Sequence, residues 1–351
     1  MNKHLKRLII MIVGVLLILI ISEAALRVLF SISKNNQRDN EFDTFIQYSP
    51  LYGWENKANI STSFKIPDTI SNVSINSMGF RDYEHNITKE KGKYRIIFVG
   101  DSINFGYGVN NDETYSKLLE TYNKKIETIN MAVSGYGTDQ EYLTIMNKGL
   151  KMNPDMVILT YTTSIDLGEN NNKVIYGKNK PLYEIINGSL ILTNVPVPES
   201  NITTKVEETS FIKSLLIYKN FRDKVISMPL IRDFLIDYLH IGRYYDFKER
   251  YNLTFKLLST INQELEAKNI KFLVIIFPDK SQVSGIISDR SIFYIADYLK
   301  ENNISYINLY NNFSKEKLND TYFKIDGHFN INGNKQVANL IYSKINKEIQ
   351  N

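Results

Sequence analysis

The stretch KYRIIFVGDSINFGYG, Lys93–Gly108, decides the fold that the sequence predicts. Its first half is a short apolar run ending at Gly100, which is typical of a buried parallel strand that feeds a loop. Its second half carries Ser102 in a loop with glycines on both sides, where Gly100 lets the backbone turn tightly. The following residues are expected to open a helix whose free N–H groups face the serine. That arrangement suits a nucleophile with an oxyanion partner, although Asp-Ser is also an ordinary helix N-cap.

Four further apolar runs of the same kind follow along the chain. They lie at 127–137, 154–162, 269–279 and 303–310. Helical patterns are found at 114–123, 138–152, 247–268, 288–301 and 332–348. Strands that alternate with helices predict a parallel sheet covered on both faces, so the expected fold class is α/β with five parallel strands.

The composition excludes several kinds of chemistry. The 351 residues include no cysteine and four histidines, which rules out disulfides, thiolate nucleophiles, iron–sulfur clusters and cysteine zinc sites. We therefore expect no cofactor and no metal. The net charge of +4 is spread along the chain without a basic block, which argues against nucleic acid as a partner.

An apolar run, Leu8–Ile21, lies close to the amino terminus. The basic residues Lys3, Lys6 and Arg7 precede it. The run fits a signal peptide cleaved after Ala24, or an uncleaved anchor that continues to Phe30. We favour a transmembrane anchor over residues 1–30. The positive-inside rule then predicts a single-pass protein of the cell membrane with its main domain extracytoplasmic.

Two segments differ in character from the alternating pattern. Residues 31–59 are polar without clear periodicity, so 31–75 is predicted to be a tether and lead-in segment. Residues 170–246 form an insertion, in which 181–198 alternates around Asn187-Gly188, a strong hairpin signal. Because it follows a strand's carboxyl end, the insertion is predicted to be a lid or specificity element, or else structural padding.

A second polar motif, Asp326-Gly-His328, precedes the last helical pattern. Two residues apart, the carboxylate can hold one imidazole nitrogen while the other faces outward. An exposed turn is the alternative interpretation. His4 lies in the basic flank, and His85 and His240 lack an adjacent carboxylate in a comparable loop, so His328 is the favoured base.

The order of these motifs resembles that of the SGNH/GDSL hydrolases. The resemblance covers residues 76–348, and NSMGFRD, Asn76–Asp82, is similar to the membrane-anchored bacterial branch. It implies a flavodoxin-like three-layer α/β/α fold for a hydrolase domain over 76–351, and acyl-ester chemistry. By this resemblance Ser102 is the nucleophile, His328 the base and Asp326 the residue that orients it. The backbone N–H groups of Ser102 and Gly135 are the implied oxyanion donors.

The third motif departs from the family pattern, in which an asparagine before an aspartate donates to the oxyanion. Aligning the aspartate on Asp166 puts Ile165 at the asparagine position and Ser164 where glycine is common. Isoleucine has no side-chain donor, and loss of one donor costs ~100–1,000-fold in turnover. Asn104, Ser164 and Asn170 are the candidate substitutes.

Three functions are compatible with these patterns. The first is an extracytoplasmic serine esterase acting on acyl esters, above all O-acetyl esters, of cell-surface glycans. The second is an O-acyltransferase of a surface polysaccharide that uses the same triad, with a membrane acyltransferase as partner. The third is a catalytically weakened glycan-binding or assembly protein, which the isoleucine at position 165 suggests.

Overall fold

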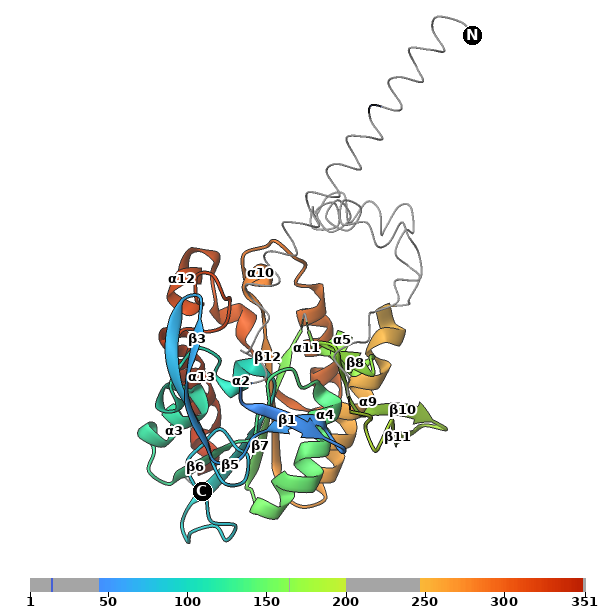
Figure 1. Ribbon diagram of the computed structural model, residues 1–351, viewed down its shortest axis with the longest axis horizontal. Helices are drawn as coiled ribbons and strands as arrows, with labels where there is room; N and C mark the ends of the chain where they lie inside the picture. The colour runs from blue at the N-terminus through green and yellow to red at the C-terminus, as the bar shows by residue number, and fades with distance from the viewer. Residues whose placement is uncertain (1–13, 15–43, 164, 200–246, 350–351) are drawn as a thin grey trace, which may run out of the picture. The chain divides into compact units, whose positions relative to one another are not determined.

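Five parallel strands form the central sheet of the protein (Figure 1). The computed structural model describes residue 14 and residues 44–163, 165–199 and 247–349. The strands are β5 (Tyr94–Val99), β6 (Ile126–Asn130), β7 (Met156–Thr162), β12 (Lys271–Phe277) and β13 (Ser305–Asn308). They are hydrogen-bonded in the order β13-β12-β7-β5-β6. All five predicted strands are confirmed, and this order is the flavodoxin-like one.

Helices cover both faces of the sheet, which gives three layers (Figure 1). One face packs against α3 (Tyr115–Tyr122) and α13 (Ile331–Ile349), and the other against α9 (Phe247–Glu266), α11 (Arg290–Glu301) and the turns that follow α4 (Thr138–Thr144). Successive strand residues face opposite layers, so Ile96 and Phe98 belong to the first core and Ile97 and Val99 to the second. The predicted helices are thereby confirmed, with 145–152 continuing α4 as π and 3-10 turns.

The strand order places the serine motif at a special point of the sheet. The strand that follows β5 in the chain lies on one side of it, and β7 lies on the other. In open α/β sheets, ligands bind outside the carboxyl ends of the strands where the order reverses in this way. Ser102 comes three residues after the end of β5 and therefore lies at this switch point.

The predicted tether is wrong for the part of it that the structure describes. From residue 44 the chain forms two hairpins, β1 (Ile46–Ser49) with β2 (Gly53–Asn56) and β3 (Ile60–Ile66) with β4 (Thr69–Ile75). Phe45, Trp54 and Phe64 are at most 3% exposed and share a core with Phe105. These few large apolar residues are widely spaced among polar ones, which is why the sequence showed no periodicity.

The first part of the insertion also forms β-structure. β10 (Leu182–Ile186) pairs with β11 (Ser189–Thr193) around Asn187-Gly188, so the predicted hairpin is confirmed. Both turn residues have positive φ, 50° and 78°, which favours Asn-Gly at this position. The short strands β8 (Val174–Ile175) and β9 (Lys178–Asn179) precede it. Residues 200–246 of the insertion lie outside the described residues.

The predicted membrane anchor, 1–30, lies outside the described residues except for Gly14. Within the described ranges, no helix has both the length and the apolar character that a membrane span requires.

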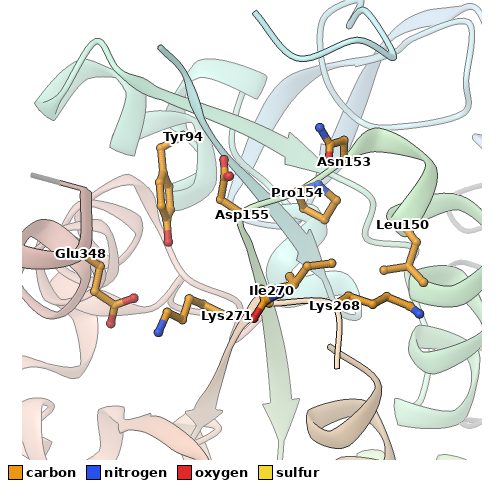
Figure 2. Close-up of a pocket in the computed structure, with 10 residues that line it drawn as sticks. Tyr94, Leu150, Asn153, Pro154, Asp155, Lys268, Ile270, Lys271 and Glu348 are labelled. Carbon is orange, nitrogen blue, oxygen red and sulfur yellow. The ribbon is translucent and has the colours of Figure 1, made fainter. Parts of the chain in front are cut away.

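A cavity of about 500 Å³ lies at the amino ends of the strands (Figure 2). Tyr94 opens β5, Asp155 precedes β7 and Lys271 opens β12, and all three line it together with Glu348 of α13. Because the strands are parallel, their amino ends all lie on one side of the sheet and their carboxyl ends on the other. The cavity therefore lies at the opposite ends of the strands from Ser102.

Candidate active site

Ser102 is the first residue of a short helix, α2 (Ser102–Phe105), that begins directly after the first strand of the sheet. The preceding Asp101 is the N-cap and accepts a hydrogen bond from Ile103 N at 2.8 Å. The capping role and the nucleophile role that the sequence suggested for Asp-Ser are therefore compatible. A Cβ at Gly100 would lie 1.9 Å from Thr160 Oγ1, so only glycine permits this turn.

Asp101 also has an unusual electrostatic environment. Its carboxylate is fully buried, and Oδ2 accepts a hydrogen bond from Thr162 Oγ1 at 2.9 Å. Burial raises the pKa of Asp101, although hydrogen bonds from Ile103 and Thr162 and the charge of His328 oppose that rise. The carboxyl group next to the serine therefore has a structural partner on the neighbouring strand.

The structure brings Ser102, His328 and Asp326 together. Ser102 Oγ lies 2.8 Å from His328 Nε2, and His328 Nδ1 is hydrogen-bonded to Asp326 Oδ1. The His328 and Asp326 side chains are 23% and 15% exposed, so the imidazole is reachable from solvent. Burial acts to raise the pKa of Asp326, but the hydrogen bonds and charge of His328 outweigh it and lower this pKa below its ordinary value. Asp326 is thus held as a carboxylate facing the imidazole.

Two residues that sequence reasoning missed contact this histidine or its loop. The Tyr107 ring stacks on the His328 ring with centroids 4.8 Å apart, and Phe64 meets Tyr107 edge-on at 4.6 Å. Asp68, between β3 and β4, accepts a hydrogen bond from Asp326 N at 2.8 Å. No local pattern marks these residues, because their partners lie far away in the sequence.

Arg81, within the NSMGFRD segment, fixes the chain that follows the serine. Its guanidinium donates to the carbonyl oxygens of Phe105, Gly106 and Val109 and, at 3.2 Å, to Asn111 Oδ1. Burial lowers the pKa of Arg81 to about 9, against the opposing effect of nearby carboxylates. The resemblance pointed to this segment but assigned the arginine no role.

The loop after β6 lies beside the serine motif and includes Gly135, the predicted oxyanion donor. Val133 N donates to Gly100 O at 3.1 Å, which ties the loop to the turn before Ser102. Gly135 has φ +78°, a left-handed conformation that favours glycine.

The candidate substitutes for the missing asparagine lie in different environments. Ile165 is the N-cap residue of α5 (Asp166–Asn170), where it makes no side-chain cap. Asn170 is buried and its amide is engaged, with Nδ2 donating to Thr254 Oγ1 at 2.9 Å. Asn104 is also buried, and its amide has no hydrogen-bond partner among the described residues. Ser164 lies outside the described residues.

Several buried carboxylates surround the carboxyl ends of β5 and β7. Asp166 accepts a hydrogen bond from Thr162 N, and Glu141 and Glu169 come from α4 and α5. Burial first, and then the charges of neighbouring carboxylates that include Asp101, raise the pKa of Asp166, Glu141 and Glu169 well above the ordinary values. The protonated form of each carboxyl group is therefore favoured, and none of the hydrogen bonds seen among the described residues joins them to Ser102 or His328.

His85 has carboxylate partners that the sequence did not reveal. Its Nε2 lies 3.2 Å from Asp82 Oδ2 and its Nδ1 lies 3.3 Å from Glu127 Oε1. Lys117 completes this group at the Asp82 carboxylate, at 2.7 Å. His85 therefore belongs to an ion-pair network, and the imidazole beside Ser102 is that of His328.

Comparison with known proteins gave structural likenesses only. No family model matches the sequence, and no curated protein matches it. Solved structures similar to this chain include a GDSL-like lipase from Bacteroides thetaiotaomicron (16% identity, 75% of this chain and 93% of that one, TM-score 0.42). Another is a lipase/acylhydrolase from Enterococcus faecalis (13% identity, 73% of this chain and 96% of that one, TM-score 0.41). A third is a catalytic mutant of an acetylxylan esterase from Geobacillus stearothermophilus (12% identity, 74% of this chain and 96% of that one, TM-score 0.39). The case for an activity therefore rests on the geometry of Ser102, His328 and Asp326.

Proposed function

We propose that this chain is a serine carboxylic ester hydrolase. The observation that carries the proposal is the 2.8 Å separation of Ser102 Oγ and His328 Nε2, with Nδ1 bonded to Asp326. A carboxylate accepts a hydrogen bond from Nδ1–H, so the proton of the neutral imidazole stays on Nδ1 and the Nε2 lone pair is directed at the serine hydroxyl. The imidazole is then the base that takes the hydroxyl proton.

The reaction proceeds in two halves. Ser102 Oγ attacks the ester carbonyl carbon as its proton passes to His328 Nε2, and the carbonyl oxygen becomes an oxyanion that the N–H groups of Ser102 and Gly135 stabilise. Collapse of this intermediate breaks the bond to the alcohol oxygen, which takes the proton from His328. A water molecule then attacks the acyl-serine as its proton passes to His328 Nε2; the bond from the acyl carbon to Oγ breaks, Oγ takes the proton back from His328, and the carboxylic acid is released.

For the substrate, we propose O-acetyl esters of cell-surface glycans, with the domain outside the cytoplasmic membrane. The support is the apolar run Leu8–Ile21 with basic residues before it, which predicts an anchored, extracytoplasmic domain. A domain in this location has direct access to the esters of surface polysaccharides. Protease added to intact spheroplasts should digest the domain, and its full protection would contradict this location.

The activity is tested with the full chain in detergent. Wild type should hydrolyse p-nitrophenyl acetate, and a fluorophosphonate should form a covalent adduct on Ser102. Ser102→Ala should abolish both, with its melting temperature showing that the variant is folded. Labelling that persists unchanged in Ser102→Ala would place the nucleophile elsewhere and contradict the proposal.

Release of acetate from an acetylated polysaccharide then tests the substrate class. If labelling occurs on Ser102 but acetate appears only on an added sugar acceptor, the enzyme is an acyltransferase. If neither the probe nor any acetyl ester reacts, the esterase proposal fails and the result favours the glycan-binding or assembly protein.

A further inference from the structure

The hairpin β3–β4 reaches the loop that carries the candidate base. Asp68, in the hairpin turn, accepts hydrogen bonds from Ile325 N, at 3.0 Å to each carboxylate oxygen, and from Asp326 N at 2.8 Å. One carboxylate therefore binds two successive backbone N–H groups, as anions do in concave turns of the chain. These contacts join residues 257 and 258 positions apart in the sequence.

The segment Phe323–His328, which we name the His328 loop, also has hydrogen bonds of its own, from Phe323 N to His328 O at 2.7 Å and from His328 N to Asp326 Oδ1 at 3.2 Å. Ile325 is 70% exposed, and Gly327 adopts φ +90°, a left-handed conformation that favours glycine. At the start of the loop, Lys280 Nζ donates to the carbonyl oxygens of Phe323 and Lys324 at 2.8 and 2.7 Å. An anion thus holds the N–H groups of the loop and a cation holds its carbonyl groups.

The same hairpin also supports the imidazole ring itself. Phe64 of β3 contacts Tyr107, and Tyr107 stacks on His328. Ile66 of β3 packs against Gly108, in the segment that follows α2, where an added Cβ would be 2.6 Å from Ile66 Cδ1. Because Phe64 and Ile66 are buried, the hairpin is held in the core, and this packing fixes the position of Asp68 in its turn.

We propose that Asp68 is a positioning residue of the active site, which holds the Asp326 backbone so that its carboxylate faces His328 Nδ1. This inference rests on the proposed function. The N–H group that Asp68 binds and the carboxylate that faces His328 belong to the same residue, Asp326, so a shift of its backbone moves the carboxylate directly. A displacement of ~1 Å at a catalytic group can cost ~100-fold in rate.

The experiment compares three variants of the full chain. Asp68→Ala removes both acceptor oxygens, Asp68→Asn keeps one, and Ser63→Ala is the control because it removes a 3.0 Å hydrogen bond to Asn72 across the same hairpin. We expect Asp68→Ala to lower kcat roughly 10–100-fold with little change in KM. Asp68→Asn should retain an intermediate kcat, and Ser63→Ala should match wild type. Rates are expressed per folded molecule, from circular dichroism and melting.

A second measurement separates positioning from general stability. If Asp68 acts through Asp326, its loss should matter little once the Asp326 carboxylate is gone, because residues that act through one another are non-additive. Fluorophosphonate labelling of Ser102 should therefore be less than about 3-fold slower in the double variant Asp68→Ala, Asp326→Asn than in Asp326→Asn alone. The proposal is overturned if Asp68→Ala equals Ser63→Ala, or if its effect is the same in both backgrounds. Failure of wild type to label at Ser102 would instead refute the esterase function itself. Should Asp68→Ala not fold, Asp68→Asn in both backgrounds decides the question by the same criterion.

Discussion

Asp101 Oδ2 accepts a hydrogen bond from Thr162 Oγ1 at 2.9 Å, which joins the carboxyl end of β7 to the residue before the candidate nucleophile. Both side chains are buried, at 2% exposed each. The same carboxylate caps α2 through Ile103 N. One buried group therefore fixes the first turn of α2 relative to the sheet, and it does so at the switch point where α/β sheets bind ligands.

Thr162→Val should weaken both the fold and the activity. The substitution keeps the shape of the side chain but leaves a buried carboxylate oxygen of Asp101 without its donor, a loss of about 1–3 kcal/mol. Urea unfolding should show a lower midpoint with an unchanged slope, and kcat should fall with it. Thr162→Ser restores the hydroxyl and should recover most of both losses; failure to do so would mean that the valine acts through packing.

Ser102 and His328 should behave as one unit. Without the serine there is no attacking oxygen, and without the imidazole nothing takes its proton, so either loss removes the same step. We expect Ser102→Ala, His328→Ala and the double variant to have nearly equal residual turnover of an acetyl ester. If the fold-loss of the double variant, relative to wild type, equals the product of the two single fold-losses, the two residues act independently.

Asp326→Asn should lower turnover by about 1,000–10,000-fold while leaving the fold intact, because an amide does not stabilise the imidazolium that forms during attack. Its effect on stability should depend on pH. The pKa of Asp326 is lowered in the folded state, so the carboxylate stabilises the fold above its ordinary pKa of 3.8, and this contribution is lost as pH falls through the lowered value. The difference in melting temperature between wild type and Asp326→Asn should therefore shrink in acid; a difference that is constant from pH 7 to pH 3 would contradict it.

Glu141→Gln should stabilise the protein at alkaline pH. Glu141 is fully buried, neither of its carboxylate oxygens has a hydrogen-bond partner among the described residues, and burial raises its pKa well above 4.5. Above pH 4.5 the unfolded chain releases this proton before the folded chain does, so stability falls as pH rises, by up to ~1.4 kcal/mol per pH unit. Urea unfolding from pH 5 to pH 9 should show a weaker decline for Glu141→Gln. The exposed Glu266→Gln is the control and should follow wild type; a decline unchanged in Glu141→Gln would assign it to other groups.

The sheet could be predicted from sequence because its signal is local. In β5 every residue after the first is buried, and in β7 all seven residues are, so each strand appears as a mostly apolar run. Ser102 and the Asp326-Gly-His328 motif could be selected because each lies close to the start of a helical pattern, Ser102 shortly after an apolar strand and the Asp326-Gly-His328 motif shortly before the last helix. Their meeting at 2.8 Å follows from the parallel arrangement, which brings the carboxyl ends of the strands to one edge.

The supports of the site could not be predicted in the same way. Asp68 binds the backbone of the His328 loop and Arg81 binds carbonyl oxygens after α2, and neither kind of contact leaves a residue pattern at the partner. The hairpin that carries Asp68 lies within residues 31–75, for which the sequence predicts a tether and lead-in segment, because the buried Phe45 and Trp54 are isolated apolar residues in polar surroundings. Contacts made by backbone atoms across the fold are visible only in three dimensions.

The last prediction concerns Ile165, at the position where an oxyanion donor was expected. Ile165 is half-buried and is the N-cap residue of α5, where it makes no capping hydrogen bond. Asparagine is among the best N-cap residues, so Ile165→Asn should cost the fold little. If no other group occupies the third donor position, the new amide should raise kcat by up to ~100-fold and leave KM nearly unchanged, because it acts on the charge that develops in the transition state.

Ile165→Asp is the matched control for this variant, since it has the same shape and capping ability but no N–H donor. Only the asparagine variant should therefore gain turnover, measured per folded molecule with melting recorded alongside. Equal turnover in wild type and Ile165→Asn would mean that another amide already fills the position. Asn104 is then the first to test, because its buried side chain has no partner among the described residues, whereas the amide of Asn170 is engaged with Thr254. A loss of ~100-fold or more in Asn104→Ala, with Asn170→Ala near wild type, would assign the donor to Asn104.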